Sequence, residues 1–224
     1  MTNSDFISYL KTVDTPTLSN AIEDLERRPR SEGFAPLAIH SLFPDLGRMC
    51  GYAVTAQVET VTCMSPLSAE PFFDLFAAVE AAPKPAVVVM QEIGGQRDLA
   101  AHCGEVMASI FTRLGAVGLV SDCGVRDLPE VHAVGMHYFA RGAVASHAHF
   151  RIVRASEPVQ IEGLVIRPGD LLHGDTNGLL VIPPCDALDL RRRVDSVRQR
   201  EGELLEYVRS DQFSLSGLRD RFLH

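Results

Sequence analysis

The chain has 224 residues, of which 46% are hydrophobic and 22% charged, and its formal net charge is −8 at pH 7. This composition can bury a sizeable core in one domain, and the net negative charge argues against a nucleic-acid surface, which needs clustered Lys and Arg. No apolar stretch approaches the ~18 residues that a membrane span needs, and no basic segment followed by an apolar core opens the chain. We therefore expect a cytoplasmic protein that binds neither a membrane nor nucleic acid.

The first half of the chain predicts alternating helices and strands. Asp14 or Thr15 caps an opening helix that has Pro16 in its first turn. Later elements are expected as a half-buried strand at 52–61, a helix at 71–82, a buried strand at 86–90, a helix at about 104–114, a strand at 117–120, a short helix after 127 and a strand at 137–140. Such alternation predicts parallel β-α-β units.

The second half changes character. Short strands are expected at 152–155, 158–161, 164–166, 170–173 and 179–182, separated by glycine-containing turns. From residue 184 a long charged helix extends to about residue 210, and a short helix follows from 214. Its basic triplet, 191–193, is interleaved with acidic residues and indicates a solvated helical face. We expect an α/β domain with two kinds of sheet at 1–183, and a C-terminal helical extension at 184–224 that packs on a neighbouring subunit.

The five cysteines are widely scattered, and no two of them form a C-x-x-C pair. An odd number at irregular spacing predicts neither a disulfide framework nor a structural zinc site, so reduced thiols are expected. They are Cys50, Cys63, Cys103, Cys123 and Cys185.

Arg126 and Asp127 stand out because they fall in a strand-to-helix turn, between the strand at 117–120 and a segment that begins near Pro129. Turns of this kind carry the chemistry of α/β folds. Asp127 can hold a divalent cation there, while Arg126 binds a carboxylate or a developing enolate oxygen. A surface ion pair, worth less than about 1 kcal/mol, explains the same two residues without any function.

Gly104 and Glu105 open a predicted helix, whose unpaired N–H groups can receive a carboxylate. Glu105 also has a purely structural explanation, since an acidic residue complements the helix dipole. Asp122 is similarly ambiguous, because Asp before Gly commonly caps a turn.

Three other patterns suggest chemistry but lack support. His147 and His149 point the same way on a strand, yet no third zinc ligand is spaced nearby, so we favour interface or outer-sphere histidines. His102 and Cys103 are adjacent in sequence and rarely could face each other as a nucleophilic pair. The glycine-rich stretch at 115–118 precedes a strand instead of following one, which argues against nucleotide binding and methyl transfer.

Several segments together resemble the RraA-like family: Gly104-Glu105, GLVSDCGVRD at 118–127, FARGAVASHAHF at 139–150, GLVIRPGDLLHGD at 163–175 and GLLVIP at 178–183. The resemblance extends from about Thr15 to Pro183. The family includes 4-hydroxy-4-methyl-2-oxoglutarate aldolases, which also decarboxylate oxaloacetate, and the regulator of ribonuclease activity A. It implies a swivelling β/β/α fold and homotrimers, often paired into hexamers.

The resemblance also implies roles for individual residues. Gly104, Glu105, Val106 and Met107 would form a cradle for a small 2-oxo acid substrate, and Arg126 would contact it. Asp127 would be the direct protein ligand of Mg²⁺ or Mn²⁺, with Asp122 and Glu105 in outer positions. An acidic residue would arrive from a neighbouring subunit, with Glu203 as the candidate and Glu201 close behind; a solvated carboxylate explains both equally well. Cys123 stands where the family usually has glycine. If that position needs a positive φ, cysteine costs about 1 kcal/mol or more there, and its side chain narrows the metal pocket.

We interpret the chain as a divalent-metal-dependent lyase, a class II pyruvate aldolase. It would cleave a C–C bond of a 4-hydroxy-2-oxo acid to release pyruvate, with oxaloacetate decarboxylation as a side activity. The two lysines, Lys11 and Lys84, lie outside the motifs, which argues against a Schiff base. The alternative is a non-catalytic regulator that binds a ribonuclease; Arg126, Asp127 and Glu105 favour the enzyme.

Overall fold

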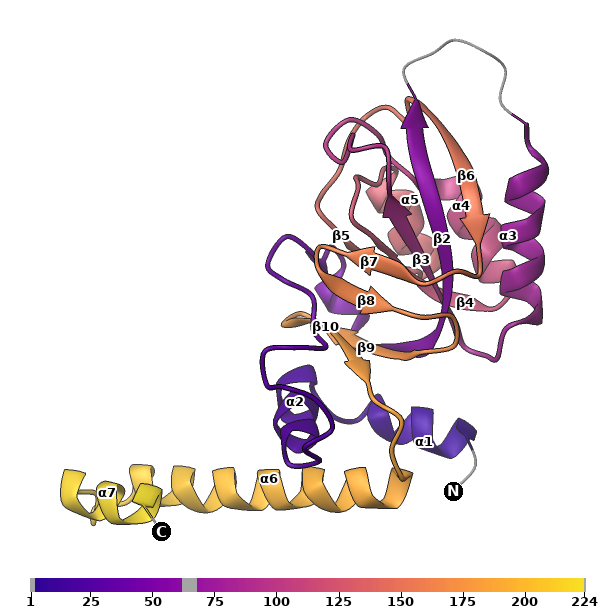
Figure 1. Ribbon diagram of the computed structural model, residues 1–224. Coiled ribbons are helices and arrows are strands. Elements are labelled where there is room, and N and C mark those ends of the chain that lie inside the picture. Colours follow the sequence, from indigo (N-terminus) through magenta and orange to yellow (C-terminus); the bar gives the residue numbers. More distant parts are fainter. Residues whose placement is uncertain (1–2, 62–67, 224) are drawn as a thin grey trace.

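The computed structural model describes residues 3–61 and 68–223, so Cys63 lies outside the described residues. Its centre is a mixed sheet that curls into a nearly closed barrel (Figure 1). The strand order is β1 (His40–Ser41), β5 (His137–Ala140), β4 (Ala116–Ser121), β3 (Ala86–Glu92), β2 (Met49–Val61), β9 (Leu171–Asp175) and β10 (Gly178–Ile182). Strands β2 to β5 are mutually parallel, which confirms the predicted β-α-β units.

The longest strand, β2, joins the two halves of the sheet. One of its edges pairs with β3 along most of its length. The other edge pairs antiparallel with β9 over Met49 to Tyr52 and with β6 (His149–Ala155) over Ala56 to Val61. A separate hairpin, β7 (Val159–Ile161) and β8 (Leu164–Ile166), packs beside this sheet. The strand expected at 52–61 is therefore longer, and the expectation that it is half-buried is wrong for its first half, because side chains there are covered on both faces.

Helices cover one face of the sheet. α3 (Glu70–Ala81), α4 (Glu105–Arg113) and α5 (Leu128–Val134) contribute Leu75, Phe111 and Val131 to the largest apolar core (Figure 1). All three helices lie close to their predicted positions. Helix α4 follows β3 after a loop and α5 follows β4 after a turn, and the beginnings of the two helices meet at the carboxyl edge of these parallel strands.

A second helical layer lies at the base of the molecule. It consists of α1 (Asn3–Leu10), which was not predicted, α2 (Thr15–Glu23) and the first half of α6 (Ala187–Arg209). Asp14 caps α2 by accepting a hydrogen bond from the Thr17 N–H at 2.9 Å, as predicted. The remaining described helical elements are a 3₁₀ turn at Pro44–Leu46 and α7 (Leu215–Leu223).

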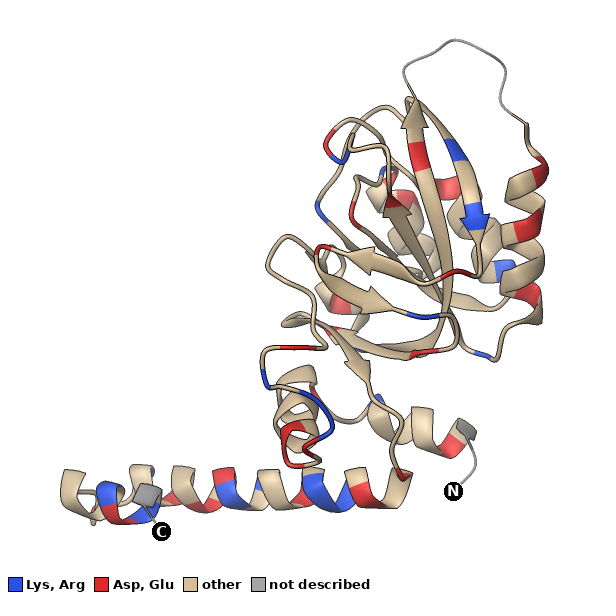
Figure 2. Ribbon diagram, in the orientation of Figure 1, with Lys and Arg blue, Asp and Glu red and all other residues tan. Residues whose placement is uncertain are grey.

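The far half of α6 projects beyond the rest of the chain, and α7 folds back along it (Figure 1). The Arg221 guanidinium lies 3.8 Å from the centre of the Tyr207 ring, which joins the two helices. Acidic and basic residues alternate along α6 (Figure 2), while Leu205, Val208 and Leu215 remain exposed. Among the described residues, no helix is both long and apolar enough to cross a membrane.

Candidate active site

The turn between β4 and α5 places Asp127 at the start of a helix in an unusual backbone conformation. Asp127 has φ 58° and ψ 44°, in the left-handed region, and its carbonyl accepts the Val131 N–H at 2.9 Å. Asp and Asn tolerate this conformation better than most residues because their short side chains hydrogen-bond locally. The backbone therefore turns the Asp127 side chain away from its own helix and toward α4.

The carboxylate of Asp127 reaches the first turn of α4. Its Oδ2 accepts the Glu105 N–H at 2.9 Å and lies 3.5 Å from Arg126 Nε. The Arg126 N–H is fixed in turn by the Cys103 carbonyl at 2.9 Å. Four predicted site residues, Gly104, Glu105, Arg126 and Asp127, are thus brought together from two helix N-termini.

Gly104 is required here by space. A Cβ at this position would lie 2.3 Å from Asp127 Oδ2 and 2.9 Å from Arg126 Nε, well inside van der Waals contact. Its φ of −134° is one that any residue adopts, so the glycine serves the approach of the carboxylate and not the backbone shape. Of the other expected cradle residues, Val106 is 73% exposed, whereas Met107 packs against the core.

Asp127 suits a hard divalent cation. Its side chain is 36% exposed, and within the described residues its hydrogen bond and ion pair both fall on Oδ2, leaving Oδ1 without a partner. Mg²⁺ is usually held by one or two carboxylates together with waters and substrate oxygens. An ordered carboxylate with one open oxygen fits that requirement.

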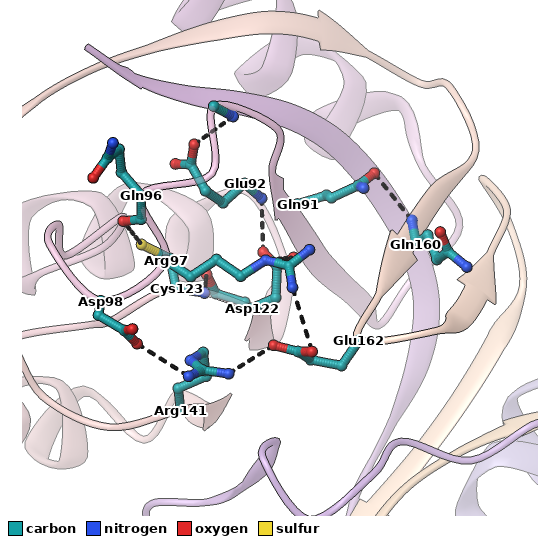
Figure 3. A network of polar contacts seen from close by, with 12 residues as sticks. Gln91, Glu92, Gln96, Arg97, Asp98, Asp122, Cys123, Arg141, Gln160 and Glu162 are labelled. Carbon is teal, nitrogen blue, oxygen red and sulfur yellow. Dashed lines mark hydrogen bonds and ion pairs between the residues drawn. The ribbon is translucent and has the colours of Figure 1, made fainter. Parts of the chain in front are cut away.

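Asp122 lies deeper and faces elsewhere. Its Oδ1 accepts the Glu92 N–H at 2.6 Å, and Arg97 Nε lies 3.4 Å from its Oδ2 (Figure 3). Burial raises the pKa of Asp122 to about 6, against the opposing effects of the Glu92 N–H and Arg97. Within the described residues no contact joins its carboxylate to Asp127. The ion pairs continue outward from Arg97 to Glu162 and from Glu162 to Arg141, at 3.4 and 2.7 Å.

A second group was not foreseen as a unit. Glu92, His102 and Cys123 are buried and bring a carboxylate oxygen, an imidazole nitrogen and a thiol to within 4.8 Å of one another. Burial opposes ionisation of Glu92, but hydrogen bonds from His102 and Thr60 outweigh it and lower the pKa of Glu92 to about 2. Residues 92, 102 and 123 have no motif spacing, so the sequence alone does not join them.

The backbone strain expected at Cys123 is absent. Cys123 is not among the non-glycine residues of positive φ. Its thiol donates to the Ala100 carbonyl at 2.9 Å, within the protein interior. The residue therefore fits the turn without cost to the backbone.

The remaining candidates are placed as follows. His147 and His149 are exposed and belong to no group of three metal-binding side chains within the described part of the chain. His102 faces Glu92 at 3.0 Å, while burial raises the pKa of Cys103 to about 12, so these two form no nucleophilic pair. Glu203 accepts a hydrogen bond from Gln199 on α6, a helix that lies apart from α4 and α5 in the same chain (Figure 1).

Residues 15–181 match the RraA-like family model, described as Aldolase/RraA. A protein of Halalkalibacterium halodurans named "Putative 4-hydroxy-4-methyl-2-oxoglutarate aldolase" is 26% identical over 222 residues, which cover 98% of this chain and 96% of that protein.

Solved structures show the same architecture. An uncharacterized protein from Pseudomonas syringae has a TM-score of 0.72 at 25% identity, covering 96% of this chain and 97% of that one. Streptomyces coelicolor RraAS2, described as an unusual member of the RNase ES inhibitor RraA protein family, has a TM-score of 0.68 at 22% identity, covering 93% and 98%. These likenesses confirm the predicted α/β fold with its C-terminal helix.

Proposed function

Because the chain belongs to the RraA-like family, we propose that it is a divalent-metal-dependent lyase that cleaves a 4-hydroxy-2-oxo acid and releases pyruvate in the cytoplasm. The observation that carries the proposal is the Asp127 carboxylate, held by the Glu105 N–H beside Gly104 and open on its Oδ1. The name of the Halalkalibacterium relative supports 4-hydroxy-4-methyl-2-oxoglutarate as the substrate type. Oxaloacetate decarboxylation, which also leaves an enolate of pyruvate, would be a side activity.

Asp127 would hold Mg²⁺ or Mn²⁺ directly. Glu105 and Asp122 would not bind the metal themselves but would stabilise the surroundings of this ligand. A bound divalent cation supplies Lewis-acid stabilisation of negative charge on substrate oxygens. The carboxylate is already oriented by one N–H, so little reordering accompanies binding. No more than one direct protein ligand is needed, because magnesium retains several waters.

Arg126 and the first turn of α4 would bind the substrate. The Arg126 side chain is 38% exposed, and its guanidinium lies beside Asp127 and can donate two parallel hydrogen bonds to a carboxylate. The N–H groups that open α4, with Val106 and Met107, would form the rest of the cradle, since a helix N-terminus favours anions. As the C–C bond breaks, Arg126 would also stabilise the charge that develops on the enolate oxygen.

The alternative function is a non-catalytic regulator that binds a ribonuclease. Its support is likeness to Streptomyces RraAS2, which at 22% identity concerns the fold. The two functions differ in whether the Asp127 turn is used at all.

The test measures pyruvate release from a panel of 4-hydroxy-2-oxo acids and from oxaloacetate, with Mg²⁺, with Mn²⁺ and after thorough chelation. We expect turnover that chelation abolishes and added metal restores. Turnover unaffected by chelation would refute the metal dependence, and no turnover of any substrate in the panel would favour the regulator.

We further propose that the active site is shared between subunits of a homotrimer or a hexamer built from two trimers. The C-terminal helices at 184–224 would pack on a neighbour and deliver Glu203, because in its own chain that residue lies on a helix remote from Asp127. The projecting half of α6, with exposed Leu205 and Val208, supports this role.

This arrangement predicts complementation. Asp127→Asn and Glu203→Gln proteins should each be nearly inactive, whereas co-refolded mixtures should regain part of the pyruvate release, because some interfaces combine two intact halves. Differential tags confirm that mixed oligomers have formed. Glu206→Gln, an exposed carboxylate on the same helix, is the matched control. Full activity in Glu203→Gln alone would remove Glu203 from the site.

A further inference from the structure

Three buried side chains, Glu92, His102 and Cys123, bring three different donor atoms close together in the protein interior. Glu92 ends β3, His102 precedes α4 and Cys123 follows β4, so three separate segments of the chain meet at the same edge of the sheet. Their ligand atoms all lie within 4.8 Å of one another, and all three residues are almost fully buried.

The donor set suits a transition metal better than magnesium. One carboxylate, one imidazole and one thiol match the oxygen, nitrogen and sulfur ligands of Zn²⁺, whereas Mg²⁺ and Ca²⁺ take oxygen ligands. Glu92 Oε2 and His102 Nε2 are 3.0 Å apart. Two ligands bonded to one tetrahedral zinc at about 2.0–2.1 Å are separated by roughly 3.3 Å, so these atoms need only a small adjustment.

Neighbouring groups hold each donor in place. Ser121 Oγ lies 3.3 Å from His102 Nδ1 and accepts the Cys123 N–H at 3.1 Å, so one hydroxyl orients both the ring and the thiol-bearing residue. Thr60 donates its N–H and its hydroxyl to Glu92. Metal-binding histidines characteristically engage their second ring nitrogen in this way.

Charge also favours a cation at this position. The carboxylates of Glu92 and Asp122 are both fully or almost fully buried, and Glu92 N donates to Asp122 Oδ1 (Figure 3). Asp122 Oδ2 has no hydrogen-bond partner within the described residues; its one ion pair is with Arg97. Within the described residues Arg97 pairs with Asp122 and Glu162 but not with Glu92, whose ionisable partner is His102. A dication bound between Glu92 and His102 would therefore offset buried negative charge that no guanidinium contacts.

We propose that Glu92, His102 and Cys123 form a second metal site, separate from the Asp127 turn, that binds Zn²⁺ or a similar transition metal and stabilises this edge of the sheet. Binding moves the His102 ring proton from Nε2 to Nδ1, facing Ser121 Oγ, and releases the Cys123 thiol proton to solvent. The metal takes the place of the proton between Glu92 and His102, and a water completes four-coordination.

The test is Co²⁺ titration of the full-length protein in metal-free buffer, followed by optical absorption, because thiolate-bound cobalt gives a charge-transfer band that oxygen-bound cobalt lacks. We expect the band to report one thiolate-bound cobalt per chain, in addition to any cobalt held at Asp127, and to disappear in Cys123→Ser. Cys103→Ser, a neighbouring buried thiol outside the group, and Cys185→Ser, the more accessible thiol, should retain it. Asp127→Asn should also retain it, which makes the result independent of the proposed lyase activity.

Two further measurements guard against a misfolded variant. Zinc absorption-edge spectroscopy of the wild-type protein should show one sulfur among lighter ligands, and Ser121→Ala should weaken zinc binding about 10- to 100-fold while leaving the thiol intact. Absence of the band in folded wild-type protein at saturating Co²⁺, or its loss in Cys185→Ser and retention in Cys123→Ser, would overturn the proposal.

Discussion

The two carboxylate sites at this edge of the sheet differ in how many partners each carboxylate already has. Asp127 is more than a third exposed and accepts one N–H, while Glu92 is 2% exposed and contacts donors from Thr60, Gly94 and His102. An open carboxylate can exchange ligands with each turnover, whereas an enclosed one holds its partners. Proximity of acidic groups alone therefore does not identify a catalytic centre; free coordination positions on a carboxylate do.

We expect the largest effect on turnover from Asp127→Asn. An amide cannot supply the negative charge that the cation needs, so we expect turnover to fall by about 100- to 1,000-fold. The melting temperature should stay close to that of the wild type, because Asn tolerates the left-handed conformation as well as Asp does. Steady-state kinetics and thermal unfolding measure the two effects, and a large loss of stability would instead assign Asp127 a structural role.

Gly104→Ala tests the close approach of the carboxylate. The new Cβ would force the end of the Asp127 side chain to move by about 1 Å, a misplacement that can cost about 100-fold in rate. Stability should change little, since a side-chain terminus moves and not the backbone. Activity equal to that of the wild-type protein would contradict the proposed role of Gly104.

Arg126→Lys separates substrate binding from catalysis. Lysine keeps the charge but cannot make two parallel hydrogen bonds, so kcat should fall and KM should rise, together about 10- to 100-fold in kcat/KM. Both constants come from the pyruvate assay. A rise in KM with unchanged kcat would limit Arg126 to binding the ground state.

Asp122→Asn should change how the free energy of unfolding depends on pH. The folded-state pKa of Asp122 is raised to about 6, so between about pH 4 and 6 the native state binds the extra proton and wild-type stability falls as pH rises. The asparagine of the variant does not titrate, so this pH dependence is absent. The variant's free energy of unfolding relative to wild type should therefore increase with pH across that window, by up to about 3 kcal/mol. Denaturant unfolding at several pH values measures the difference, and a flat difference would show that the Asp122 pKa is ordinary.

Most of the fold could be predicted because its signals are local. Asp14 and Pro16 mark a helix start, and the apolar run from Ala86 to Met90 marks a buried strand. What failed depends on tertiary context. The first half of β2 packs on one face in the core that contains α3 and on the other in the core that contains the β7–β8 hairpin, about 100 residues later in the chain. Helix α1 has only 8 residues, so its sequence signal is short.

The site divides in the same way. Arg126 and Asp127 were found because they are adjacent in one turn, and Gly104 and Glu105 because they open a helix. The group of Glu92, His102 and Cys123 was missed because its members come from three segments whose meeting depends on strand register. The unusual residue at position 123 was the one available signal, and it was attributed to backbone strain.

The long strand β2 has a consequence for synthesis on the ribosome. Its outer edge pairs with β6 and β9, which begin about 90 and 110 residues after β2 ends. At translation rates of about 5–20 residues per second, that edge remains uncovered for roughly 5–20 s after it emerges. An unpaired strand edge is a template for pairing with other chains. The nascent protein therefore passes through a period in which its most extensive strand is open to aggregation and to chaperones, although the finished molecule hides it completely.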